Sequence, residues 1–73
     1  MSEGGGREYR REIGLRVRQI REAQGLSLRK LALMVGMDYK YLFSIEHGEA
    51  NATIDVLAKI ADGLNIELRD LFV

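Results

Sequence analysis

Few side chains of this sequence could perform covalent or metal chemistry, and their spacing brings none of them together. The 73 residues include no Cys, which excludes disulfides and cysteine-based zinc sites, and a single His, which cannot build a metal site unaided. Glu46 has no partner acid, base or metal ligand with which it could act as a catalytic carboxylate. We therefore expect no enzymatic activity, no metal and no cofactor, which leaves recognition of a partner by hydrogen bonds and packing.

The stretch GMDYKYLFSIEHG, residues 36–48, concentrates the side chains suited to such recognition. It carries one lysine and an unusual number of aromatic residues. The outline of this stretch resembles a tight turn followed by a partner-reading helix. These aromatic side chains contact either a nucleic acid or a partner protein.

Net charge is zero, but the charges are unevenly distributed. Residues 1–30 hold eight Arg/Lys against four Asp/Glu, whereas residues 31–73 hold three against seven. The first part could present a basic face to a polyanion, and a solvated, charged helix explains its Arg residues about as well. No apolar run approaches the roughly 18–20 residues of a membrane span. Without a visible signal peptide or any Cys, we expect a cytoplasmic protein with no membrane partner.

Glycines, capping residues and apolar spacing divide the chain into five predicted helices and no strand. Residues 1–6, MSEGGG, are polar and glycine-rich and predict a flexible N-terminal tail. Ile13, Val17 and Ile20 recur at helical spacing and predict a first helix over about residues 7–24, which Gly25 ends. A single domain is then expected over residues 7–73, because a chain of this length allows no second core.

The remaining predicted helices begin after residues whose side chains can cap a helix N-terminus. Ser27, Asp38 and Thr53 each precede an apolar repeat and can accept a hydrogen bond from an unpaired backbone N–H. Gly36 separates the second helix from the third because it can adopt a positive φ. The fourth helix extends to about Leu64, and a short fifth helix is expected over about residues 67–72. The predicted fold class is therefore all-α, with five helices.

Residues 28–47 have the form of a helix-turn-helix motif. Ala32 is small, as it must be where a second helix crosses closely over the first. Gly36 lies in the tight turn, whose backbone conformation is costly for a residue with a Cβ atom. The apolar wedge between the two helices is expected to consist of Leu31, Val35, Met37, Leu42 and Ile45.

On these residues the chain resembles the lambda-repressor/Cro-like family, also called XRE-type helix-turn-helix proteins. The resemblance runs from IGLRVRQIREAQGLS through LALMVG and SIEHG to IDVLAKIADGLNIELRDLF, and so covers about residues 13–72. Among its members the chain is most similar to the controller proteins of restriction–modification systems. The resemblance implies a five-helix lambda-repressor-like fold, binding of an operator as a homodimer, and no catalysis.

The resemblance also implies an ion pair between the first and third helices. Arg21 and Glu46 fall where members of the family place it. A buried ion pair fixes geometry more reliably than it adds stability, and the loss of one partner is strongly destabilising. We therefore expect this pair to be structural.

DNA contacts are implied on the second and third helices. Lys40 can donate to guanine in the major groove, and Phe43 can pack on a thymine methyl group. The predicted base-reading residues are Tyr39, Lys40, Phe43 and Ser44, and the predicted DNA-backbone contacts are Ser27, Arg29, Lys30, Tyr41 and Asn51.

Some of these assignments have alternatives. Arg29 and Lys30 either contact phosphates or are simply solvated. Both oppose the helix dipole at a cost of roughly 0.3–1 kcal/mol each, which favours phosphate contact. Tyr41 could equally belong to the core. Leu28 replaces the Gln that usually opens the second helix of the family, and the loop after the third helix has little positive charge. These departures predict weaker and more salt-sensitive DNA binding.

Apolar residues at the C-terminus exceed what one small core can cover, which predicts a C2 homodimer. Two recognition helices would then address half-sites about 34 Å apart on a palindromic operator. We expect a sequence-specific transcriptional regulator that binds double-stranded DNA and no small-molecule ligand. The alternative is a protein-interaction module, antitoxin-like or adaptor, that uses its aromatic third helix. The predicted dimer interface comprises Leu64, Ile66, Leu68, Leu71, Phe72 and Val73.

Overall fold

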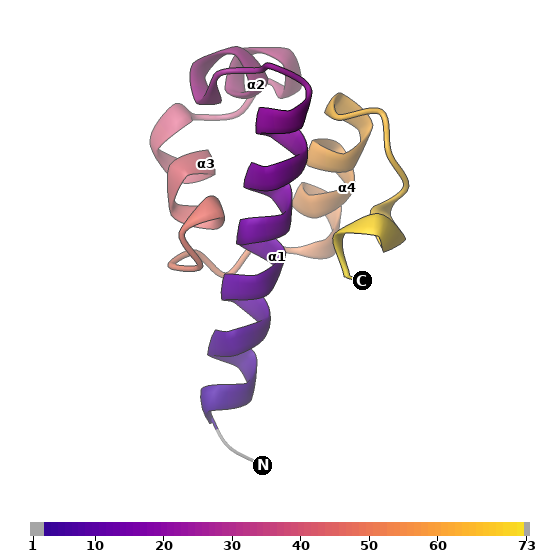
Figure 1. Cartoon of the computed structure of the whole chain (residues 1–73). Coiled ribbons are helices and arrows are strands. Elements are labelled where there is room, and N and C mark those ends of the chain that lie inside the picture. Colours follow the sequence, from indigo (N-terminus) through magenta and orange to yellow (C-terminus); the bar gives the residue numbers. More distant parts are fainter. Residues whose placement is uncertain (1–2, 73) are drawn as a thin grey trace.

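Four α-helices and one short 3-10 helix make up the fold (Figure 1). The computed structural model describes residues 3–72, and within them no strand occurs. The elements are α1 (Glu3–Ala23), α2 (Leu28–Val35), α3 (Tyr39–Glu46), α4 (Ile54–Gly63) and the 3-10 helix η1 (Leu68–Leu71). The prediction of an all-α fold is therefore confirmed, and α2, α3 and α4 begin directly after the predicted caps.

One apolar core joins these elements. In Figure 1, α1 stands at the centre with α3 on one side and α4 on the other, while α2 lies across its C-terminal end. Helix α2 packs against both α3 and α4, and η1 packs against α1 and α4. The largest fully buried side chains come from all five elements and from the residue that follows α4: Val17, Leu31, Leu42, Ile60, Leu64 and Leu71.

The last predicted helix is a 3-10 turn instead of a fifth α-helix, so the predicted count of five α-helices is wrong. Asn65 ends α4 with a left-handed φ of 60°, a conformation that Asn tolerates better than most residues. Glu67 and Asp70 then form a capping box at the start of η1. The four residues of η1 can close i→i+3 hydrogen bonds but are too few for a stable α-helical ladder.

Helix α1 begins earlier than predicted. It starts at Glu3 rather than near Arg7, so the prediction of a flexible tail over residues 1–6 is wrong for residues 3–6. Met1 and Ser2 lie outside the described residues. Glycines disfavour a helix because they lose much conformational entropy in it. Extending an existing helix still costs little, because each added residue gains a hydrogen bond and no new helix has to be nucleated. The first turns of α1 consequently project beyond the other helices (Figure 1).

The turn between α2 and α3 has the geometry that the sequence predicted. Gly36 adopts a left-handed φ of 65°, and the N–H of Met37 donates to the carbonyl of Ala32 at 2.9 Å. Asp38 caps α3, with its Oδ2 accepting from the N–H of Lys40 at 3.0 Å and of Tyr41 at 3.2 Å. The predicted caps at the starts of α2 and α4 are confirmed as well. This turn therefore sets the angle at which α3 is presented.

A glycine in the middle of α1 allows α3 to approach it closely. A Cβ atom at Gly14 would overlap the backbone oxygen of Ile45 and would lie 2.8 Å from the oxygen of Glu46. Both oxygens belong to the C-terminal end of α3, where the backbone of α3 lies directly on α1. Gly14 was not among the residues predicted to have a role.

Candidate nucleic-acid interface

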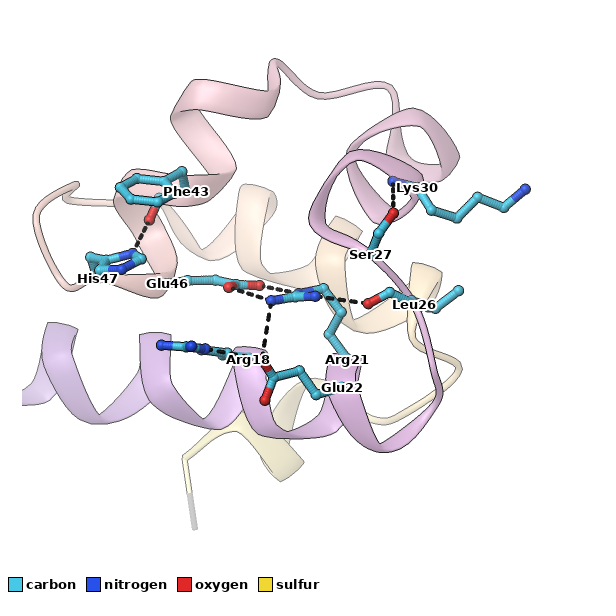
Figure 2. A network of polar contacts seen from close by, with 9 residues as sticks. All are labelled: Arg18, Arg21, Glu22, Leu26, Ser27, Lys30, Phe43, Glu46 and His47. Atoms are coloured by element: carbon cyan, nitrogen blue, oxygen red, sulfur yellow. Dashed lines mark hydrogen bonds and ion pairs between the residues drawn. The ribbon is translucent and has the colours of Figure 1, made fainter.

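The Arg21–Glu46 ion pair holds α3 against α1. Arg21 Nε lies 2.7 Å from Glu46 Oε2, and Arg21 Nη2 lies 3.0 Å from Oε1, which makes the contact bidentate (Figure 2). Both residues are buried. Arg21 Nη1 also donates to the carbonyl of Leu26 at 2.7 Å, so the same guanidinium holds the segment between α1 and α2. The predicted structural ion pair is confirmed.

The carboxylate of Glu46 favours the charged form of the Arg21 guanidinium. Its hydrogen bond with Arg21 raises the pKa of Arg21 above the ordinary value, against the opposing effect of burial. A raised pKa of a base stabilises the fold below that pKa, and this contribution is lost only as the pH rises through it. The electrostatic anchor of α3 is therefore fully formed at neutral pH.

Lys40, Tyr41 and Phe43 form an outward side of α3 that lies outside the buried core. Lys40 is exposed, and Tyr41 and Phe43 keep 37% and 42% of their surface accessible. Neither aromatic residue belongs to the buried core, whose α3 members are Leu42 and Ile45. The alternative that Tyr41 fills the core is therefore wrong, because its position on the helix turns it away from this inner pair.

Phe43 and His47 form a stacked pair at the end of this outward side. Their ring centroids are 4.0 Å apart and the ring planes differ by 20°. His47 Nδ1 lies 2.9 Å from the carbonyl oxygen of Phe43, as Figure 2 shows. A carbonyl can only accept, so Nδ1 donates and Nε2 is left for another contact. This pair was not predicted from the sequence, although its i, i+4 spacing is typical of side chains in contact on a helix.

Ser44 is partly engaged within α3 itself. Its Oγ donates to the carbonyl of Lys40 at 3.1 Å. The hydroxyl proton is thereby used, while its lone pairs can still accept a hydrogen bond from a base amino group.

The start of α2 adds positive charge near α3. Ser27 Oγ accepts from the N–H of Lys30 at 3.0 Å, and its own proton remains available for an anion (Figure 2). Arg29 and Lys30 are both exposed. The guanidinium carbon of Arg29 lies 4.3 Å from the centroid of the Tyr39 ring. This cation–π contact joins the beginnings of α2 and α3 and was not predicted from the sequence.

Asn51 and the predicted dimer-interface residues lie outside α2 and α3. Asn51 is exposed in the loop between α3 and α4. Of the predicted interface residues, Leu64 and Leu71 are 0% and 2% exposed and belong to the core of the monomer, so their assignment to a dimer interface is wrong. The reason is that η1 folds back on α1 and α4 and covers them. Ile66 and Leu68 are half-buried, Phe72 is 51% exposed, and Val73 lies outside the described residues.

Phe72 borders an open groove between α1 and the C-terminal segment. The groove has a volume of about 500 Å³, and Tyr9, Ile13, Leu15 and Leu71 also line it. Tyr9 and Leu15 are exposed. The groove therefore joins three exposed large apolar side chains on one side of the molecule.

No group of three or more potential metal ligands occurs within residues 3–72. Among the same residues, no helix is long and apolar enough to cross a membrane.

Comparison with known proteins agrees with this architecture. The family model described as Helix-turn-helix matches residues 17–71. The control protein C.MunI of a Mycoplasma species is 37% identical over 61 residues, which cover 82% of each protein. SlrR of Bacillus subtilis, a helix-turn-helix transcriptional regulator, is 36% identical over 61 residues. Those residues cover 82% of this chain but 40% of SlrR, so the chain spans less than half of that relative.

The fold of this chain is also similar to that of a solved structure. The restriction–modification controller protein C.AhdI of Aeromonas hydrophila superposes with a TM-score of 0.84 at 38% identity, covering 86% of this chain and 96% of that protein. The relatives named above are a control protein, a transcriptional regulator and a restriction–modification controller protein. The chain therefore belongs to the XRE-type helix-turn-helix family.

Proposed function

We propose that the protein binds a specific double-stranded DNA operator as a homodimer and inserts α3 into the major groove. The outward side of α3 carries this proposal. It presents Lys40, Tyr41 and Phe43 free of the core, and the exposed cations Arg29 and Lys30 lie at the start of the preceding helix. A partner with closely spaced phosphates and base edges matches this combination. Because such a partner is chromosomal or plasmid DNA, the protein acts in the cytoplasm.

Base recognition falls to residues on α3. Lys40 donates to guanine O6 or N7, and the exposed Phe43 packs against a thymine methyl group. The stacked His47 ring stiffens Phe43 and extends its apolar surface. Ser44 retains acceptor lone pairs for the amino group of adenine or cytosine.

Backbone contacts come from residues around α3. The N-terminus of α2 offers the Ser27 hydroxyl and unpaired backbone N–H groups to a phosphate. Arg29 and Lys30 add charge there, Tyr41 contributes its hydroxyl beside the groove, and Asn51 reaches from the loop after α3. Contacts of this kind set register and give affinity its salt dependence.

The dimer is proposed to form through the exposed apolar side chains that border the groove. Phe72 lies there with Tyr9 and Leu15, and burial of their surface against a second copy would remove it from water. A C2 pair of this domain would place its two α3 helices on successive half-sites, about 34 Å apart.

The proposal is tested by selecting duplexes from a random pool and measuring their affinity by fluorescence anisotropy at several salt concentrations. We expect an enriched palindrome whose binding weakens steeply with salt. Lys40→Ala should weaken binding roughly five- to one-hundred-fold at a site containing guanine, which corresponds to one lost base contact.

Lys59→Ala is the matched control, because Lys59 is also exposed but lies on α4. It removes the same charge and should leave affinity nearly unchanged. If no duplex binds at low salt while a second protein co-purifies with the chain, the protein-interaction alternative is correct instead.

A further inference from the structure

The contact between Arg29 and Tyr39 has features that simple surface solvation does not explain. Tyr39 is half-buried and packs against the core, so its ring is a fixed support. The guanidinium of Arg29 lies 4.3 Å from the centre of that ring. Arg29 is exposed, and it forms none of the ion pairs found among residues 3–72. Its charge therefore has no protein anion as a partner in this part of the chain.

Arg29 lies at a position on α2 where a positive charge is unfavourable for the helix. It is the second residue of α2, where a cation opposes the helix dipole, while Tyr39 is the first residue of α3. The stack thus joins the N-terminal ends of the two helices of the motif. At the start of α3, the cap formed by Asp38 fixes the backbone of the following residues. Tyr39 therefore offers Arg29 a platform whose position is set from both the core and the cap.

We propose that Tyr39 is a positioning residue, which holds the Arg29 guanidinium in the orientation needed to bind a DNA phosphate. This role rests on the proposed function. Stacking occupies one face of the guanidinium and leaves the N–H groups at its edge free, since all five donors lie in the plane of the group. A phosphate can accept two of these hydrogen bonds side by side. Holding the flexible Arg side chain before binding reduces the rotamer freedom lost on contact.

This role differs from the base-reading role predicted for Tyr39. One face of the ring is covered by Arg29 and another part of the side chain packs against the core. Tyr39 therefore affects DNA through Arg29, and the hydroxyl is not required for the stack. Because the stack needs only the aromatic ring, a Phe at this position should preserve it and an aliphatic residue should not.

The free protein provides a test that needs no DNA. In the NMR spectrum, the ring current of Tyr39 should shift the Hδ resonances of Arg29 upfield, and the shift should persist in Tyr39→Phe and disappear in Tyr39→Leu. Random-coil Hδ shifts in the wild type would overturn the proposal, whatever the DNA affinity.

The binding experiment compares Tyr39→Phe, Tyr39→Leu, Arg29→Ala and the Tyr39→Leu/Arg29→Ala double variant on a selected duplex, with anisotropy measured over a range of KCl concentrations. Arg29→Ala should lower the slope of log K against log [KCl] by about 0.9, the value of one phosphate contact. Tyr39→Leu should weaken binding roughly two- to fivefold, the ratio expected of an exposed cation–π contact, and Tyr39→Phe should match the wild type. In the Arg29→Ala background, Tyr39→Leu should cause no further loss. An equal loss in both backgrounds would overturn the positioning role.

A second variant avoids any disturbance of the core by Tyr39→Leu. Arg29→Lys keeps the charge but loses the planar group that stacks and donates in pairs. We expect an unchanged salt slope with affinity roughly two- to fivefold lower, whereas wild-type affinity would overturn the proposal. If the wild-type protein binds no duplex at low salt, the proposed function fails. If it binds and the Tyr39 variants match it, only the positioning role fails.

Discussion

The buried contacts of Arg21 and Glu46 engage all three guanidinium nitrogens and both carboxylate oxygens. Two N–H···O bonds join them, and the third guanidinium nitrogen donates to Leu26. A charge in such a site is tolerated because its partner compensates for the lost hydration. Removal of one partner leaves the other buried and unpaired, which is much more costly than the loss of an exposed pair.

Glu46→Ala should therefore lower the free energy of unfolding by about 3–5 kcal/mol, as measured by urea denaturation. Glu22→Ala is the matched control, because Glu22 Oε2 lies 3.8 Å from Arg21 Nη2 while its side chain remains 55% exposed. An exposed pair contributes roughly 0–1 kcal/mol, so the control should remain close to the wild type. Equal losses in the two variants would contradict a structural role for the buried pair. Replacement of both partners by Arg21→Met/Glu46→Leu should restore part of the stability lost in Glu46→Ala.

At the residue scale, sequence reasoning succeeded where a residue's role depends on a fixed place in the motif. Arg21 and Glu46 were paired through the resemblance to a known family, and their contact is present. The stack of Arg29 on Tyr39 was not predicted, because it joins two helices whose crossing angle and side-chain rotamers cannot be read from spacing. The base and phosphate contacts assigned to α3 and its surroundings stay predictions.

Helix α3 is an element whose position depends on a missing side chain in α1. Alanine is a better helix former than glycine by up to about 1 kcal/mol, so a glycine inside a helix is normally a weakness. At Gly14 the balance is reversed, because a Cβ atom would overlap backbone atoms of α3. Backbone oxygens cannot move aside as a flexible side chain can.

Gly14→Ala should therefore destabilise the protein by roughly 1–3 kcal/mol, the usual cost of overpacking, although it improves helix propensity. Gly6→Ala in the same helix is the control, since its Cβ atom would meet only Arg10 Nη1 at 3.8 Å. Thermal unfolding should show a lower Tm for the first variant and an unchanged or slightly higher Tm for the second. A stabilised Gly14→Ala protein would show that α1 and α3 are not in close backbone contact.

Element boundaries were predicted well where the determinants are local. Ser27, Asp38 and Thr53 cap helices because each side chain reaches a backbone N–H two or three residues away. The contact at Gly14 depends on a segment some thirty residues further along the chain, so it could not be predicted from neighbouring residues. The extension of α1 to Glu3 was not predicted for a different reason. The glycines near the N-terminus suggest a flexible chain, but lengthening an existing helix is much easier than starting a new one.

At the scale of the whole molecule, the apolar surface is smaller than the sequence suggested. The count of apolar residues near the C-terminus was correct, but η1 returns Leu64 and Leu71 to the core of the same chain. Exposed apolar surface remains at Phe72 and extends to Tyr9 and Leu15 on α1. The proposed dimer therefore depends on a surface built from both ends of the described chain.

Phe72→Ser should weaken self-association about tenfold or more, as expected when a central aromatic contact is lost. Sedimentation equilibrium at several protein concentrations measures the effect. Leu33→Ser is the control, because Leu33 is 77% exposed on α2 and does not line the groove. It should leave the association constant unchanged. A wild-type protein that remains monomeric at several hundred micromolar would contradict the proposed dimer.

The close seating of α3 on α1 also has a consequence for how new binding preferences arise. Backbone contact at Gly14, the pair with Arg21 and the cap at Asp38 fix the inner side and both ends of α3. None of these restraints involves the outward side chains. Substitutions of the outward side chains therefore change which groups can contact a partner but do not change the orientation of α3. The outer side of α3 can thus diverge among related proteins while the stability of the fold remains constant.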